Sequence, residues 1–421
     1  VSVDDQDPNE FPIKFYYKYY VDLRYDPWRL RLFSMNPCLP ENFAIPARIY
    51  CKNSPQTLEL IGRHTEKKCP YEWDVNCFYN SFFFEANITE IPDKLEIFVS
   101  KRRIEFRHSK IVRKEKKKGL TMIVAPVYFY SHIHNIFLFF EAWRAQGATK
   151  FLVFYHSGTQ ETRKILEYYR GLGIVELLPW PGFGELPEYI RNRHPEVDSS
   201  VCRSGQTLAQ NIAALEADTD LASSVDFDEI LVSENMTVEA RIRKVFNNLK
   251  IAGAAYFPHH YVQFEPNIEN FNYRGVLKPM IFDEEKANKM VFNTSVVDNI
   301  DVHFMNSFIS DETIHGILDN TALLHNRFKY NPNKTQEVEL NMKIFPENEI
   351  AHLNNMKRDL KNIFQSNPKL NPKINEALEE CFKNLEKIKV CRSLVYFCKP
   401  AVMKFGVDWD FESTPPSEIF L

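Results

Sequence analysis

Strand-like and helix-like segments alternate four times between residues 121 and 232, and this alternation restricts the fold more than any other feature. Continuous apolar runs of this length suit strands that are buried on both faces of a sheet. The alternation predicts an α/β fold with a mostly parallel central sheet and helices on both faces. The expected strands cover residues 121–127, 150–155, 174–178 and 221–232, and the expected helices cover residues 136–143, 160–169 and 204–217.

Acidic residues interrupt the last of these strands at Asp226, Asp228 and Glu229. On an extended chain Asp226 and Asp228 point to one side, while Phe227 points to the other. Two carboxylates so close need a shared proton or a divalent cation, and oxygen ligands suit Mg²⁺ or Mn²⁺, which complete their shells with water and phosphates. An Asp-x-Asp alone more often marks a solvated turn. Its place at the carboxyl end of a buried strand, where α/β sheets bind ligands, favours a metal site for a nucleotide-diphosphate substrate.

The chain divides into three expected domains. Residues 1–118 carry short alternating runs, many aromatic residues and clustered cysteines, which predicts a small cysteine-stapled β-rich domain that serves as a packing collar or a sugar-binding module. Residues 119–345 form the expected catalytic domain, without the glycine-rich motifs of a Rossmann site or a P-loop. Residues 346–421 are expected to be a helical extension, broken near Asn367-Pro368.

Composition limits the classes of binding partner and the cellular compartment that fit this chain. With 52 basic and 56 acidic residues the net charge is −4, which gives no drive toward nucleic acid. No apolar run is long enough to span a membrane, so we expect a trimmed, soluble ectodomain. Four N-glycosylation sequons and eight cysteines favour a secretory compartment, with disulfides among the first four cysteines and among the last three.

Several short motifs follow one another along the chain. They are Ala125-Pro126-Val127-Tyr128, Glu141, residues 146–151, Tyr155-His156, residues 225–229, Val302-His303 and residues 324–327. As a set, over about residues 119–330, they resemble glycosyltransferase family 92. The resemblance implies a GT-A fold, a Mn²⁺ cofactor, UDP-galactose as donor, inversion at the anomeric carbon, and a Golgi type II membrane protein whose anchor is missing here. The sequence departs from the family pattern at Ile123-Val124, at Ser223-Ser224 and over residues 258–265.

These residues receive expected roles. Asp228 is the first choice for a direct metal ligand, and Asp226 binds the ribose, or the metal through water. By resemblance His303 is the third metal ligand, with His325 as the second choice. Cations beside the leaving diphosphate would add to the effect of the metal, and the candidates are Lys278, Arg327 and His325.

An inverting displacement also needs a general base near the attacking hydroxyl. Glu265 and Glu269 are the candidates, with Asp311 and Glu312 as alternatives. We expect galactose transfer to a fucose or other sugar hydroxyl of N-glycans in β-1,4 linkage. The rivals are a catalytically silent glycan-binding module, a metal-dependent nucleotidyltransferase and a transferase for another UDP-sugar. The aromatic content is compatible with a homodimer. Candidates for stacking on sugars are Trp180, Tyr256, Tyr261 and Tyr273.

Overall fold

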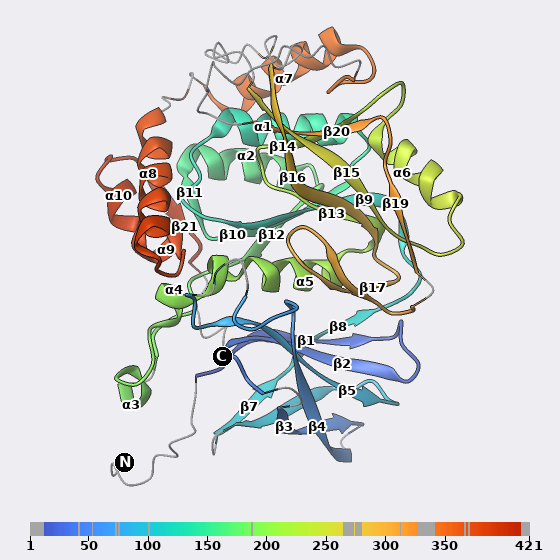
Figure 1. The fold of residues 1–421 in the computed structure, drawn as a ribbon, viewed down its shortest axis with the longest axis vertical. Helices are drawn as coiled ribbons and strands as arrows, with labels where there is room; N and C mark the ends of the chain where they lie inside the picture. The colour runs from blue at the N-terminus through green and yellow to red at the C-terminus, as the bar shows by residue number, and fades with distance from the viewer. Residues whose placement is uncertain are drawn as a thin grey trace.

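The computed structural model describes residues 12–413 apart from residues 41–42, 53, 72–73, 75, 100–101, 187, 264–272, 274–279, 312, 327–341, 366–367 and 369–370. The N-terminal strands form one curved sheet in the order β7-β6-β3-β4-β5-β2-β1-β8 (Figure 1). Neighbours are antiparallel except β1 and β8, which are parallel. The strands are β1 (Lys14–Asp22), β2 (Trp28–Asn36), β3 (Ala44–Cys51), β4 (Ser54–His64), β5 (Asn80–Ile88), β6 (Lys94–Val99), β7 (Arg102–Phe106) and β8 (His108–Val112).

Both faces of the N-terminal sheet are apolar. Phe15 and Tyr19 point into a core within the curve of the sheet, where Phe15 meets Phe106 of β7 at 6.2 Å between ring centroids. Tyr16 and Tyr20 point to the other face, because side chains alternate along a strand. This second face packs against the rest of the molecule.

The central sheet has the order β12-β10-β9-β13-β16-β15-β20-β14, with β19 also paired to β15. From β12 to β13 the neighbours are parallel, as predicted. The expectation of a mostly parallel sheet is wrong beyond β13, because β16 runs antiparallel to both β13 and β15, and β14 runs antiparallel to β20. The strands are β9 (Lys117–Val127), β10 (Lys150–Tyr155), β12 (Val175–Pro179), β13 (Thr219–Ser224), β14 (Glu229–Ser233), β15 (Ala252–Gln263), β16 (Met280–Asn293), β19 (Ile314–Ile317) and β20 (Thr321–Asn326).

The mixed topology follows from the connections. Helical crossovers, which parallel neighbours require, join β9, β10, β12 and β13. Only residues 225–228 separate β13 from β14, which is too short for a crossover, and β14 pairs at the far edge of the sheet instead. The sheet therefore becomes mixed beyond β13, the strand that leads into the acidic turn at residues 225–228.

Helices cover both faces of the central sheet (Figure 1). On one face α1 (Ile133–Ala145), α2 (Gln160–Gly171), α6 (Val238–Asn247) and α7 (Glu349–Ile363) pack into one core. On the other face α5 (Gln206–Glu216) lies between the central sheet and the N-terminal sheet. All its residues from Thr207 to Glu216 are buried, as expected for a helix enclosed by two sheets.

The C-terminal segment packs beside the central sheet. It contains α8 (Pro372–Ile388), α9 (Leu394–Phe397), α10 (Lys399–Met403) and β21 (Trp409–Phe411), which pairs with β11 (Ser157–Thr159). The remaining elements are α3 (Glu188–Arg191), α4 (Val197–Ser200), the 3₁₀ turn η2 (Cys202–Gly205) and the hairpin of β17 (Val297–Ile300) and β18 (Met305–Phe308). Among the helices that the structure describes, none is long and apolar enough to cross a membrane.

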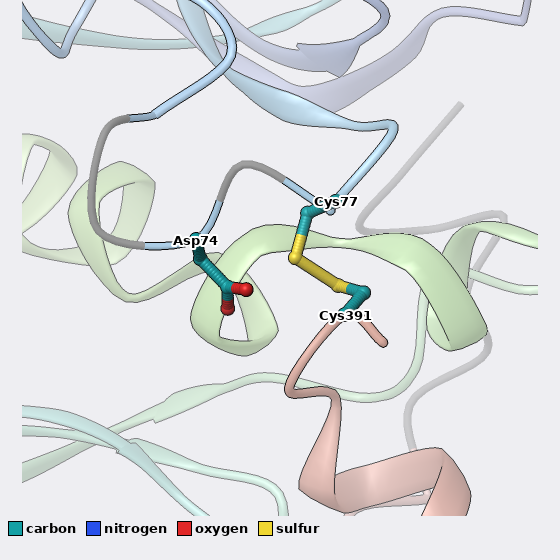
Figure 2. A group of neighbouring side chains, drawn as sticks. All are labelled: Asp74, Cys77 and Cys391. Carbon is teal, nitrogen blue, oxygen red and sulfur yellow. A yellow bond between two sulfur atoms is a disulfide. The ribbon is translucent and has the colours of Figure 1, made fainter. Parts of the chain in front are cut away.

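Disulfides join cysteines within and between the expected clusters. Cys38–Cys69 lies within the first cluster and Cys381–Cys398 within the last, as predicted. Cys77–Cys391 instead links the two clusters across 314 residues and ties the C-terminal segment to the loop before β5 (Figure 2). Asp74 lies beside this disulfide. The sulfur atoms of Cys77 and Cys391 are already bonded to each other, so these three residues do not offer a metal site. Cys51 and Cys202 are buried free thiols.

Candidate functional site

The acidic turn between β13 and β14 presents two carboxylates on one side. The amide of Glu229 donates to the carbonyl of Asp226 at 3.0 Å, and the amide of Asn326 donates to the carbonyl of Asp228 at 2.8 Å. Phe227 points the opposite way and is buried against the rings of Phe139 and Phe140, 5.2 and 5.9 Å away. Asp226 and Asp228 consequently line the same cavity.

His325 of β20 lies beside Asp228 because of the register between two strands. β14 pairs with β20 so that Glu229 stands opposite His325. The Nε2 atom of His325 is 3.2 Å from Oδ2 of Asp228, and its Nδ1 atom is 2.9 Å from Nε2 of His259 on β15. The planes of the two imidazole rings are 9° apart and their centroids are 5.0 Å apart. His325, one of the two histidines proposed as ligands, thus contacts the acidic turn.

Lys289 of β16 contacts the carboxylates of Asp226 and Glu229 at the acidic turn. Its Nζ atom is 3.1 Å from Oε2 of Glu229 and 3.4 Å from Oδ2 of Asp226. Lys289 and Glu229 are 3% and 1% exposed, so this ion pair is almost completely removed from water. Burial lowers the pKa of Lys289, but the two carboxylates outweigh it and hold the pKa above its usual range. Burial raises the pKa of Glu229 against the attraction of Lys289.

The cavity has a volume of about 530 Å³ and two chemically different walls. One wall is formed by the ends of strands and the acidic turn, with the side chains of Ala125, Pro126, Tyr128, Asp226, Asp228 and His325. Burial raises the pKa of Tyr128 to about 12, so its hydroxyl is protonated at neutral pH. The other wall comes from η2, the start of α5 and the C-terminal segment, with Arg203, Gln206, Phe382, Arg392 and Leu394. The cavity therefore brings two aspartates and two arginines together.

The acidic turn and His325 fit a divalent cation. Oδ2 of Asp228 and Nε2 of His325 are 3.2 Å apart, close to the roughly 3 Å between neighbouring ligands of an octahedral ion. Carboxylate oxygen and imidazole nitrogen are both ligands that Mn²⁺ accepts. Oε1 of Glu229 lies 3.5 Å from Nδ1 of His325, an outer carboxylate of the kind that orients a ligating imidazole. Glu229, His259 and His325 also form a buried group, but Glu229 is already paired with Lys289.

The other predicted site residues lie elsewhere or outside the described part. His303 lies in the turn between β17 and β18 and is not among the residues that line the cavity, so its role as a ligand stays a prediction. Asp311 is exposed after β18. Of the aromatic candidates, none lines the cavity: Trp180 and Tyr273 are 2% exposed, and Tyr256 and Tyr261 are half-buried. Glu265, Glu269, Lys278, Glu312 and Arg327 lie outside the described residues.

Sequence reasoning missed several residues that the structure brings to the site. Lys289 carried one local signal, a lysine directly before the apolar run that starts at Met290. His259 belongs to a segment that was recognised only as a departure from the family pattern. Arg203 and Arg392 come from a turn and from the C-terminal segment, and no local pattern connects either with the acidic turn.

Comparisons with known proteins identify one family. The sequence model of glycosyltransferase family 92 matches residues 118–383. No curated protein matches the chain. Among solved structures, residues 1–349 of S. aureus TarS are similar at 14% identity and a TM-score of 0.30, over 68% of this chain and 88% of that one. The same TarS fragment in complex with UDP matches at 13% identity, with the same TM-score and coverage.

A third solved structure is glucosyl-3-phosphoglycerate synthase from Mycobacterium tuberculosis, in complex with Mn²⁺, UDP and glucosyl-3-phosphoglycerate. It matches at 9% identity and a TM-score of 0.25, over 60% of this chain and 82% of that one. Similarities this low leave the family match as the finding that bears on function.

Proposed function

The chain belongs to glycosyltransferase family 92, and on this basis we propose that it transfers a sugar from a nucleotide sugar to a carbohydrate hydroxyl in the cavity beside Asp226 and Asp228. The observation that carries the proposal is the pair formed by Asp228 and His325, 3.2 Å apart at the carboxyl ends of the strands. A family of nucleotide-sugar enzymes needs a place for a diphosphate, and this pair lies at the edge where α/β sheets bind such ligands.

The residues of the acidic turn receive separate roles. Asp228 and His325 hold a divalent cation, which when bound acts as a Lewis acid on the leaving diphosphate. Asp226 is 45% exposed and has oxygen atoms available for the ribose or for a metal-bound water. Glu229 orients His325 from behind, and Lys289 keeps the carboxylates of Asp226 and Glu229 from repelling each other.

The finer assignments extend the resemblance noted in the sequence. We propose UDP-galactose as the donor, Mn²⁺ as the metal, and a β-1,4 linkage to the core α-1,6-fucose of N-glycans, as in the nematode galactosyltransferase that the motifs also resemble. Glu265 or Glu269 is the proposed base, and Lys278 and Arg327 are proposed phosphate contacts. The proposed setting is the Golgi lumen, with the chain as the luminal part of a type II membrane protein, either alone or as a homodimer.

UDP release by the purified protein tests the proposal. With Mn²⁺, a panel of UDP-sugars and fucosylated N-glycans, we expect release that requires both donor and acceptor. EDTA should abolish it, and Asp228→Asn should lower it by at least about a hundredfold, the effect of about 3 kcal/mol of lost transition-state stabilisation. Asp218→Asn, on a carboxylate that is 70% exposed and does not line the cavity, is the control and should retain full activity.

The outcomes separate the rival functions. Glycan binding without any UDP release would contradict the proposal and favour a binding module. Release of inorganic pyrophosphate would instead indicate a nucleotidyltransferase. Transfer from a UDP-sugar other than UDP-galactose would keep the proposed reaction but overturn the donor.

A further inference from the structure

Arg203 belongs to the wall formed by η2 and the C-terminal segment, and it lines the same cavity as Asp226 and Asp228. Its guanidinium carbon is 5.8 Å from the ring centroid of Tyr71, whose hydroxyl donates to Asp301 at 2.8 Å. Within the described part of the chain, no ion pair joins Arg203 to a carboxylate. Arg392, the other arginine of this wall, is paired with Asp74 at 3.4 Å. Within this part of the chain, Arg203 thus has no direct carboxylate partner of the kind that Arg392 has.

The backbone at Arg203 is strained. Arg203 has φ 44° and ψ 40°, and the next residue, Ser204, has φ 52° and ψ 30°. Left-handed conformations are costly for residues other than glycine, and they persist where the surrounding structure holds them. The indole of Trp180 donates to the carbonyl of Ser204 at 3.1 Å, and a Cβ atom at Gly205 would lie 2.8 Å from that indole. Packing against Trp180 thus fixes the turn that carries Arg203.

We propose that Arg203 binds the diphosphate of the donor and stabilises the charge that develops on it during transfer. The inference rests on the proposed glycosyltransferase function and adds a residue to it. An acceptor hydroxyl oxygen forms a bond to the anomeric carbon while the bond from that carbon to the β-phosphate oxygen breaks. The electron pair stays on the phosphate oxygen, and the hydroxyl proton passes to a carboxylate base.

The charges of the cavity favour a diphosphate over a neutral sugar as the ligand of Arg203. A ligand that fills the cavity meets both a cation held by Asp228 and the guanidinium of Arg203, and both favour negative charge. A diphosphate has oxygen atoms on two phosphorus centres and meets both needs, and a neutral glycan meets neither. The planar guanidinium also matches two phosphate oxygens at once.

Binding of UDP, UMP and uridine by calorimetry with Mn²⁺ tests the role of Arg203. In Arg203→Ala we expect the affinity for UDP to fall about tenfold to a hundredfold, the effect of one lost charge-assisted contact, while the affinity for uridine stays the same. Arg203→Lys should recover part of the loss, because an ammonium makes a single contact. The value of kcat for UDP-sugar turnover should fall as well.

Two further variants separate binding from folding. Arg203→Gly removes the guanidinium and relieves the strained backbone, so its Tm should be no lower than that of the wild type, while UDP affinity falls as in Arg203→Ala. Arg170→Ala, on an exposed arginine of α2, should leave both quantities unchanged.

Three results overturn the proposal or its premise. Unchanged UDP affinity and unchanged kcat in Arg203→Ala, beside a wild type that binds UDP, would overturn the role of Arg203 alone. A loss confined to the KM for the acceptor would do the same and move Arg203 to the acceptor site. A wild-type protein that does not bind UDP would overturn the proposed function itself.

Discussion

Replacing Lys289 with methionine should destabilise the protein strongly. The new side chain has a similar length but lacks the positive charge. Nζ of Lys289 contacts the carboxylates of Glu229 and Asp226 at 3.1 and 3.4 Å, and Glu229 is 1% exposed. Removing one partner of a buried ion pair typically costs about 3 to 5 kcal/mol, because the other charge stays buried without compensation. The acidic turn would then hold neighbouring carboxylates with no cation between them.

The expected cost can be converted into a melting temperature. Unfolding entropy is about 2.1 cal/mol/K per residue, which over 421 residues gives about 0.9 kcal/mol/K. A loss of about 3 to 5 kcal/mol therefore lowers Tm by about 3 to 6 °C. Without Lys289, the pKa of Glu229 should rise further above its unfolded value. A carboxyl whose pKa is raised in the folded state makes the protein less stable as pH rises. The free energy of unfolding that Lys289→Met loses should therefore be smaller at pH 5 than at pH 8.

Denaturant titration of wild type and variants provides the measurement. Glu229→Gln added to Lys289→Met should recover about half of the loss, because a neutral amide is cheaper to bury than a carboxylate. Lys150→Met is a matched control, since Lys150 pairs with Glu176 at 3.0 Å where the side chains are 37% and 48% exposed, and such pairs contribute less than about 1 kcal/mol. If Lys289→Met cost no more than Lys150→Met, the buried pair would not support the turn as argued.

Two other perturbations follow from the structure. Cys391→Ser should cost about 5 kcal/mol of stability, because the bond closes a loop of 314 residues. It should also raise the KM for the donor, because the C-terminal segment that lines the cavity loses its tether. Cys38→Ser should destabilise the protein without changing this KM, and equal KM values in the two variants would contradict the argument. Acid should also destabilise the protein, because burial lowers the pKa of three histidines while the unfolded chain keeps about 6.5 and binds more protons between these values. Between pH 7 and pH 5, each histidine should lower the free energy of unfolding measured by denaturant titration by up to about 2 kcal/mol. A free energy of unfolding that stays constant over this range would refute the lowered pKa values. The histidines are His132, with a pKa of about 3, and His134 and His156, with pKa values of about 4.

Local patterns predicted local structure well. The strand expected over residues 150–155 is β10 residue for residue, and the helix expected over residues 204–217 is α5 shortened by a few residues. The helical break expected near Asn367-Pro368 falls between the end of α7 at Ile363 and the start of α8 at Pro372, and Asn367 itself lies outside the described residues. These features depend on hydrophobic periodicity and breakers within a short window, which the sequence displays directly.

Features that depend on distant pairing could not be predicted in this way. The direction of β16 is set by its partners β13 and β15, and nothing within β16 itself indicates that direction. The contact between Asp228 and His325 depends on the register of β14 and β20, which lie more than 80 residues apart. The acidic pair was therefore recognisable from the sequence alone, whereas the contact of His325 with Asp228 was not. Arg203 escaped notice because a left-handed turn at a residue other than glycine has no sequence signature.

The burial of α5 determines where the protein can be shortened. Lys18 and Tyr20 of the N-terminal sheet both donate to Oε1 of Glu216 at 2.8 Å, so that sheet covers the polar end of the helix as well as its apolar side. A protein reduced to the stretch that the family shares would expose this whole face of α5 to water. Such a surface invites self-association, and a shortened enzyme would aggregate even though every residue of the acidic turn was present.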